Sequence, residues 1–130
     1  MTSRSADSLD ILRSFAPGTG LRAAVDLILR QGTGALVLIG SGPEVDAVCS
    51  GGFALSDATF TAQRLAELAK MDGGIVVSPD AAQIVRANVH FNPDASILTS
   101  ETGTRFRTAE RLARQTACPV LSVSLKVQNE

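Results

Sequence analysis

The chain alternates continuous apolar runs with segments in which apolar residues recur every three or four positions. A continuous run between glycines is typical of a strand buried on both faces, and the wider spacing is typical of a helix that buries one face. The runs predict strands at Ala35–Ile39, Val45–Cys49, Gly74–Ser78, Gln83–Phe91 and Pro119–Ser124. The wider spacing predicts helices at Asp7–Phe15, Gly20–Arg30, Thr59–Met71 and Thr104–Thr116. This order predicts an α/β fold with a mixed central β-sheet flanked by helices.

Turn residues mark the boundaries of these elements. Thr19 is expected to cap the helix that follows it, and Gly32 to end that helix in a left-handed conformation. The glycine-rich turn at residues 40–43 predicts a hairpin that joins Ala35–Ile39 to Val45–Cys49. Gly73 is expected to be the left-handed residue that ends the third helix.

Composition narrows the class of protein. A chain of 130 residues with 45% hydrophobic content is expected to form one domain over residues 1–130. The net charge of −1 argues against direct DNA binding by this domain. Cys49 and Cys118 are far apart and the chain has 1 histidine, so neither a zinc site nor a disulfide framework is predicted. No segment is long and apolar enough for a membrane span, and we expect a cytoplasmic protein.

The polar stretch at residues 100–111 runs into the fourth helix with arginines in its first turn. A helix dipole disfavours cations there, and a bound phosphate would offset this cost. Threonine hydroxyls, guanidinium groups and free N–H groups together suit phosphoryl oxygens. The alternative is an ordinary helix start with Thr102 or Thr104 as N-cap. In that case Phe106 belongs to a buried stripe with Ala109, Leu112, Ala113 and Thr116.

A second candidate segment is Asp72, which precedes Gly73 and Gly74. The glycines have an ordinary interpretation as a helix end and a strand start. That interpretation leaves the carboxylate unexplained. An aspartate beside glycines that admit a ligand is suited to polarising a sugar hydroxyl or to holding a divalent metal.

Segments along nearly the whole chain match the sequence motifs of one family. They are Leu12–Arg22, Thr33–Leu36, Gly51–Phe53, Leu68–Gly73, Ile84–Ala87, Ser100–Arg105, Thr108–Arg111 and Val123–Ser124. In these segments the chain resembles the diadenylate cyclase (DAC) domain, most nearly the N-terminal domain of bacterial DNA integrity scanning proteins. Such domains condense two ATP molecules into cyclic di-AMP with a metal ion, and two domains face each other with one ATP each.

The resemblance implies a role for each candidate residue. Asp72 would be the catalytic residue beside the ribose 3′ hydroxyl and would bind Mg²⁺ or Mn²⁺. The residues implied in nucleotide binding are Gly73, Gly74, Thr104, Arg105, Phe106, Arg107, Thr108 and Ser124. The implied ligands are ATP and cyclic di-AMP, and the implied assembly is a homo-oligomer with face-to-face domains.

Two positions depart from the family's motifs. Gly74 stands where the Asp-Gly-Ala motif has alanine, and Phe106 stands where the Arg-His-Arg motif has histidine. Phenylalanine can neither donate a hydrogen bond to phosphate nor exchange a proton. His90 is expected to be a partly exposed strand residue, not a substitute. Two hypotheses therefore stay open: a cyclase weakened or inactivated by Phe106, and a non-catalytic sensor or partner that binds ATP or cyclic di-AMP.

Overall fold

The computed structural model describes residues 20–99 and 103–124. The predicted helix at residues 7–15 and the candidate caps Thr19 and Thr102 lie outside these residues. In chain order the helices are α2 (Gly20–Gln31), α3 (Pro43–Ala47), α4 (Ala62–Leu68) and α5 (Thr104–Thr116). The strands are β1 (Ala35–Ile39), β2 (Cys49–Ser50), β3 (Phe53–Ala54), β4 (Gly74–Val77), β5 (Ile84–Phe91) and β6 (Val120–Val123).

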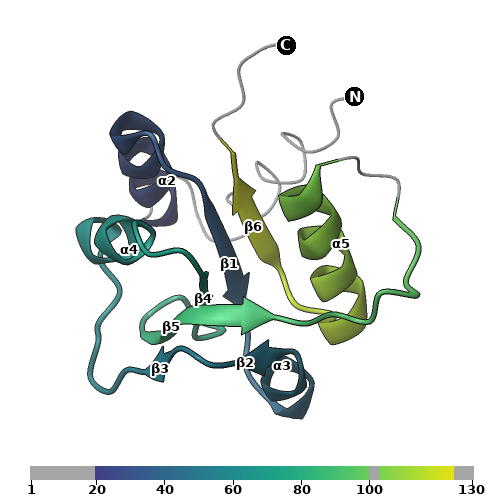
Figure 1. Ribbon diagram of the computed structural model, residues 1–130. Coiled ribbons are helices and arrows are strands. Elements are labelled where there is room, and N and C mark those ends of the chain that lie inside the picture. Colours follow the sequence, from purple (N-terminus) through teal and green to yellow (C-terminus); the bar gives the residue numbers. More distant parts are fainter. Residues whose placement is uncertain (1–19, 100–102, 125–130) are drawn as a thin grey trace.

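The strands form one mixed sheet, which confirms the predicted α/β class (Figure 1). Its order is β2-β5-β4-β1-β6, and β3 also pairs with β5. The central strands β1 and β4 are parallel, with Val37 opposite Ile75. The outer strands β5 and β6 run antiparallel to them. The sheet therefore places the starts of β1 and β4 beside the ends of β5 and β6.

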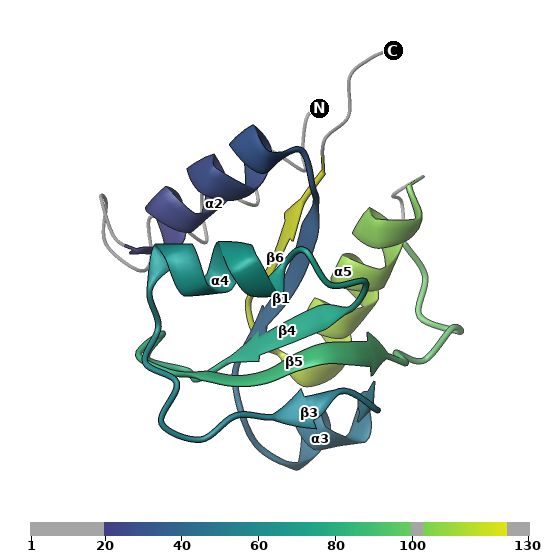
Figure 2. The ribbon, with the colours of Figure 1, turned by 60° about the vertical axis from the view of Figure 1, so that its left-hand side comes forward.

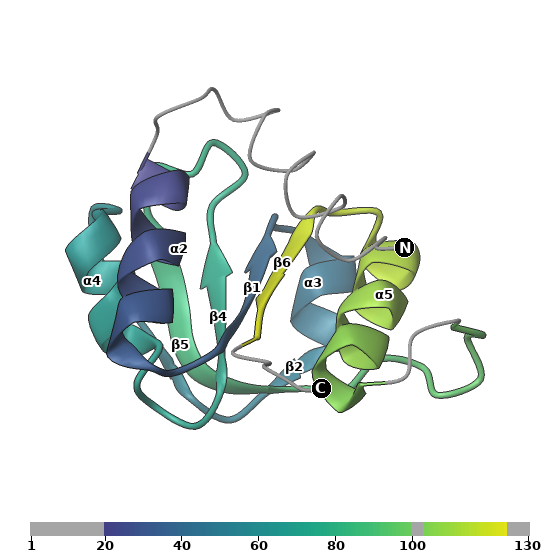
Figure 3. The ribbon, with the colours of Figure 1, turned by 90° about the horizontal axis from the view of Figure 1, so that it is seen from above.

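Helices cover both faces of the sheet and enclose two apolar cores. Viewed from above, α2 and α4 lie on one side of the strands, and α3 and α5 lie on the other (Figure 3). Leu21, Ile28 and Leu65 of α2 and α4 pack with Val37 and Ile75 of the sheet in the first core. The second core contains Leu38, Val45, Val76, Val89, Phe91 and Leu112. Both sides of β1 and β4 are buried, as their continuous apolar runs predicted.

The ends of two helices follow ordinary capping chemistry. Gly32 has φ +80° and ends α2 as predicted. The Thr61 side chain accepts a hydrogen bond from Arg64 N at 3.0 Å and caps α4. The predicted helix at residues 59–71 is therefore too long at both ends. Helix α4 stops at Leu68, short of the predicted end at Met71. At the other end, Thr59 lies before the helix and forms a β-bridge with Gln83.

The predicted hairpin after β1 is wrong. Pro43 occupies the first turn of α3, where its fixed φ suits a helix and its missing N–H costs nothing. Val45 and Val48 are three positions apart, and both are buried in the second core. That spacing places both valines on one face of a helix turn, whereas a strand would turn them to opposite faces. The chain then enters β2, which pairs with β5 instead of β1.

The prediction that Gly73 ends a helix in the left-handed region is also wrong. The C-cap of α4 is Ala69, with φ −67°, and Gly73 is not among the described glycines with positive φ. Close contact explains this glycine instead. A Cβ on Gly73 would lie 2.8 Å from both Cα and C of Asn88. No side chain fits between these two backbones.

Strand β5 carries two irregularities in its ladder with β4. Val77 pairs with Ile84 and Val76 with Arg86; likewise Ile75 pairs with Ala87 and Gly74 with Val89. One residue of β5 is extra in each interval, and Asn88 is the extra residue in the second. Asn88 has φ +55°, a left-handed conformation that is uncommon outside glycine. Bulges of this kind often redirect side chains beside binding sites.

The helices within residues 20–99 and 103–124 include none with the length and apolarity that a bilayer crossing requires. All of them instead pack against the sheet (Figure 2).

Candidate functional site

A cavity of about 910 Å³ lies at the edge of the sheet where β1 and β4 begin and β5 and β6 end. Four segments line it: the turn between α2 and β1, the loop between α4 and β4, the end of β5, and the start of α5 with Ser124. The predicted site residues that line it are Asp72, Gly73, Gly74, Thr104, Arg105, Phe106, Thr108 and Ser124. Arg107 is exposed on α5 and is not among the lining residues.

The start of α5 forms one wall of the cavity. Its N-cap is Gly103, not Thr104, and no side chain caps it. No acidic residue lies in its first turn. The positive end of the helix dipole therefore faces the cavity without a carboxylate in the first turn of the helix, an arrangement that favours an anion. Ala109, Leu112 and Thr116 are buried as the helical stripe predicted, whereas Phe106 is half-buried and lines the cavity.

Arg105 joins this helix to the sheet. Its Nη1 donates a hydrogen bond to the carbonyl oxygen of Val123 at 2.9 Å, at the end of β6. A Cβ on Gly34 would lie 1.7 Å from the same Nη1, so the guanidinium occupies the space that a side chain at position 34 would need. This bond places the charged guanidinium group of Arg105 at the end of β6, and the residue lines the cavity.

The loop before β4 forms the opposite wall. Asp72 is exposed in this loop. Gly74 is buried, and a Cβ there would lie 2.1 Å from Cε2 of Phe91. The Phe91 ring thus occupies the space of the alanine methyl group that the family's motif would place at Gly74. The departure at Gly74 has a steric cause in this chain.

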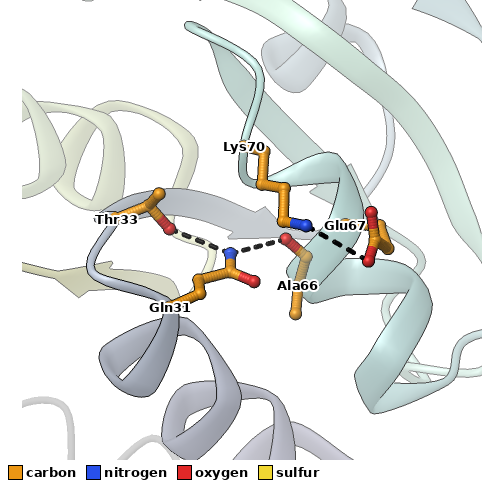
Figure 4. A network of polar contacts seen from close by, with 5 residues as sticks. All are labelled: Gln31, Thr33, Ala66, Glu67 and Lys70. Atoms are coloured by element: carbon orange, nitrogen blue, oxygen red, sulfur yellow. Dashed lines mark hydrogen bonds and ion pairs between the residues drawn. The ribbon is translucent and has the colours of Figure 1, made fainter.

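A polar network fixes the two loops of this wall to each other (Figure 4). Nε2 of Gln31 donates to Thr33 Oγ1 at 2.9 Å and to the Ala66 carbonyl oxygen at 2.8 Å. Nζ of Lys70 lies 3.3 Å from Oε2 of Glu67. Gln31 therefore ties the end of α2 to the last turn of α4. The segments that carry Thr33 and Asp72 leave this junction and line the cavity.

The sequence did not predict the part of the cavity that β5 contributes. Asn88, Val89, His90 and Phe91 line it, and the side of the strand with Asn88 and His90 is exposed. His90 is an exposed strand residue, in line with its expected environment. Gly73 was the sequence signal for this part of the cavity. A glycine that does not serve a turn indicates a close neighbour, and the neighbour of Gly73 is Asn88.

Asp72 is the carboxylate in the cavity lining that suits a divalent metal. Within residues 20–99 and 103–124, no three His, Cys, Asp or Glu side chains come together as a metal cluster. Mg²⁺ is commonly bound by one or two carboxylates together with substrate phosphates and water. The donor set at Asp72 fits a metal that arrives with a polyphosphate, and it does not fit a structural metal held by protein ligands alone.

The family of the chain follows from comparison with known proteins. The family model described as DisA bacterial checkpoint controller nucleotide-binding (DAC) matches residues 22–129. The chain belongs to this family of nucleotide-binding diadenylate cyclase domains.

Curated relatives narrow the resemblance further. The chain is 56% identical over 113 residues to the DNA integrity scanning protein DisA of Parafrankia sp. (strain EAN1pec), which covers 87% of the chain and 31% of that protein. It is 54% identical over 126 residues to DisA of Kineococcus radiotolerans, which covers 95% of the chain and 35% of that protein. The chain spans about a third of the length of these relatives.

Solved structures share the fold. A hypothetical membrane spanning protein from Bacillus cereus superposes with a TM-score of 0.71 at 20% identity, over 94% of this chain and 64% of that one. A double mutant of DacA from Staphylococcus aureus superposes with a TM-score of 0.64 at 19% identity, over 82% of this chain and 73% of that one. These similarities extend the fold assignment to the whole sheet and its helices.

Proposed function

We propose that this domain binds ATP and cyclic di-AMP in the cavity and is a diadenylate cyclase domain whose turnover is limited by Phe106. The observation that carries the proposal is that Asp72, Arg105 and Ser124 come from separate segments and line one cavity. Its volume, about 910 Å³, falls in the range of small-molecule sites, which is about 300–1,000 Å³. We propose that the reaction takes place in the cytoplasm, where ATP is available, and that this domain does not contact DNA.

In this proposal the start of α5 binds the triphosphate. The first-turn N–H groups and the hydroxyls of Thr104, Thr108 and Ser124 donate to phosphate oxygens, and Arg105 supplies a charge that its bond to Val123 already orients. Arg107, exposed and outside the cavity lining, adds to the positive potential at this helix start.

The reaction joins two nucleotides and therefore needs two domains that face each other, as the resemblance implies. The ribose 3′ oxygen of each ATP forms a bond to the α-phosphorus of the other, and each bond from that phosphorus to pyrophosphate breaks. Two ATP molecules thus give one cyclic di-AMP and two pyrophosphates. Asp72 orients the attacking hydroxyl and receives its proton. A bound Mg²⁺ or Mn²⁺, held by Asp72 and the triphosphate, would neutralise charge on the leaving pyrophosphate.

Phe106 sets the expected rate. Phosphoryl transfer depends mainly on positioning and on charge stabilisation, and removal of one donor at the reacting group costs about 10²–10³ in rate. Phe106 places an apolar, half-buried ring in the cavity lining. This same observation favours the second candidate function, a non-catalytic sensor that binds ATP or cyclic di-AMP.

Ligand-induced stabilisation tests the binding step. ATP and cyclic di-AMP should raise the melting temperature of the wild type, because a ligand of the native state stabilises it by mass action. Arg105→Ala should abolish that rise. Arg114→Ala is the matched control: Arg114 lies near the far end of α5 and pairs with Glu110 at 2.9 Å, so the nucleotide effect should persist. No shift of the wild type at millimolar nucleotide would remove the proposal.

Product analysis separates the cyclase from the non-catalytic sensor. Phe106→His should increase the cyclic di-AMP formed from ATP and Mg²⁺ or Mn²⁺ by about 10²–10³ over the wild type. Mass spectrometry measures cyclic di-AMP and its linear intermediate, and light scattering measures whether nucleotide brings two domains together. A folded Phe106→His variant that binds ATP and forms dimers, yet makes no product, would reject the cyclase and leave the sensor.

A further inference from the structure

Asn88 combines an unusual backbone with a position in the cavity. Its φ of +55° is the left-handed conformation, and it is the extra residue of the second β5 bulge. Asn tolerates this conformation better than most residues, but glycine adopts it without steric cost. The Asn88 side chain is therefore available for a contact that glycine could not make.

The backbone of Asn88 is fixed from two sides by glycines. The Cβ position of Gly73 lies 2.8 Å from Cα and C of Asn88. The Cβ position of Gly52, whose φ is +69°, lies 2.7 Å from the Asn88 carbonyl oxygen. Neither neighbour has room for a side chain. The direction in which the Asn88 side chain leaves the strand is therefore determined by the packing.

That direction leads to the loop before β4, which carries Asp72 and Gly73. Oδ1 of Asn88 lies 2.6 Å from the Cβ position of Gly73, the residue that directly follows Asp72. Asn88 is exposed, it lines the cavity, and its carboxamide makes no hydrogen bond to any of the described residues. A neutral oxygen acceptor and an N–H donor thus lie beside Gly73, next in the chain to Asp72, without a hydrogen-bond partner among the described residues.

We propose that Asn88 binds the ribose 2′ hydroxyl of the nucleotide and so selects ribonucleotides over 2′-deoxyribonucleotides. This inference rests on the proposed function, which places the ribose at Asp72 and the phosphates at the start of α5 on the opposite wall. A hydroxyl donates to the amide oxygen, and the uncharged amide adds no repulsion toward the phosphates, as a second carboxylate would.

The test is a cycle between protein and ligand. Wild type, Asn88→Gly and Gln83→Ala are titrated by calorimetry with ATP, 2′-deoxy-ATP and 3′-deoxy-ATP at one Mg²⁺ concentration. Glycine accepts φ +55° freely, so Asn88→Gly should melt at or above the wild-type temperature. Its affinity for ATP should fall about three- to tenfold, the effect of one lost hydrogen bond. Gln83→Ala removes a carboxamide just before β5, at the end of the strand away from the cavity and outside its lining, and should bind ATP as the wild type does.

The analogues identify the contact. In the wild type, 2′-deoxy-ATP should bind about three- to tenfold more weakly than ATP, whereas Asn88→Gly should bind 2′-deoxy-ATP and ATP equally. The inference would be overturned, while nucleotide binding stands, if Asn88→Gly bound ATP as tightly as the wild type does. It would also be overturned if Asn88→Gly lost affinity equally for all three nucleotides. The same hydroxyl-dependent loss in Gln83→Ala would also overturn it. Absence of ATP binding by the wild type would overturn the proposed function and this inference together.

Discussion

Replacement of Gly74 by alanine restores the family's motif and is expected to destabilise this chain. The new methyl carbon would lie 2.1 Å from Cε2, 2.6 Å from Cδ2 and 2.9 Å from Cζ of Phe91. Carbon atoms in favourable contact are about 3.5 Å apart, so the ring edge must retreat by about 1.4 Å. Phe91 is only 8% exposed and packs in the second core, so one side of the ring is confined.

The magnitude follows from the cost of overpacking. A buried site that must absorb an extra methyl group loses about 1–3 kcal/mol. An unfolding entropy of about 2.1 cal/mol/K per residue over 130 residues means that each kcal/mol shifts the melting temperature by about 4 °C. Gly74→Ala should therefore melt about 4–12 °C below the wild type.

A second substitution tests whether Phe91 is the cause. Phe91→Leu replaces the ring with a smaller side chain. The Gly74→Ala, Phe91→Leu double variant should therefore lose at least about 1 kcal/mol less unfolding free energy than the sum of the two single variants' losses. Thermal and urea unfolding of the four proteins give this coupling energy. Gly103→Ala is the matched control, since its Cβ would lie 3.4 Å from its nearest neighbour, Phe106 Cδ2; its cost should stay below about 1 kcal/mol.

Two results would refute the steric reasoning. Gly74→Ala that unfolds like the wild type would mean that the ring moves into the cavity at no cost. Additive losses in the double variant, within about 0.5 kcal/mol, would mean that the alanine acts on something other than Phe91.

Three further predictions concern groups outside the cavity. Thr116→Val should lower the unfolding free energy by about 1–2 kcal/mol in urea titrations, because Thr116 Oγ1 donates a hydrogen bond to Leu112 O at 2.7 Å. Thr116→Ser keeps the hydroxyl and should keep most of this free energy. An unchanged unfolding free energy in Thr116→Val would refute this role. The hydrogen bond from Ser78 is the main cause that lowers the pKa of the Asp80 carboxyl below its ordinary value. Its contribution to stability is therefore present above that ordinary value and is lost as pH falls through the lowered pKa of the folded state. Melting curves between pH 6 and pH 2 should show a smaller acid loss in Asp80→Asn than in the wild type; equal losses would contradict it. Burial raises the pKa of the Cys49 thiol, so iodoacetamide should modify it more slowly at pH 8 than a model thiol, and a matching rate would contradict this.

The sequence predicted those elements whose apolar pattern has one physical interpretation. The run at residues 35–39 and the stripe of α5 gave nearly the observed bounds, because burial on two faces or on one face leaves different periods. The strand predicted at residues 45–49 is wrong because Val45 and Val48, three positions apart, share one face of a helix turn and would point to opposite faces of a strand. Pro43 decided the outcome, since its ring favours a helix start.

The candidate site was predictable where a short motif carries its own chemistry and not where distant segments meet. Asp72 and Arg105 stand in recognisable motifs, and both line the cavity. The contribution of β5 depends on strand order and on a bulge, which no local pattern records. Nor does the sequence show that the ring of Phe91 occupies the space beside Gly74, because the two residues are far apart in the chain.

The bulge at Asn88 has a consequence for insertions and deletions. Ile75 pairs with Ala87 and Gly74 with Val89, so residue 88 is extra to a ladder that is regular without it. Loss of one codon within the regular part of a strand turns every following side chain to the opposite face. Loss of codon 88 would instead leave Ala87 and Val89 on their present sides, and both cores intact. Natural selection can therefore remove or restore this cavity side chain by a change in gene length, independently of the residues that hold the fold.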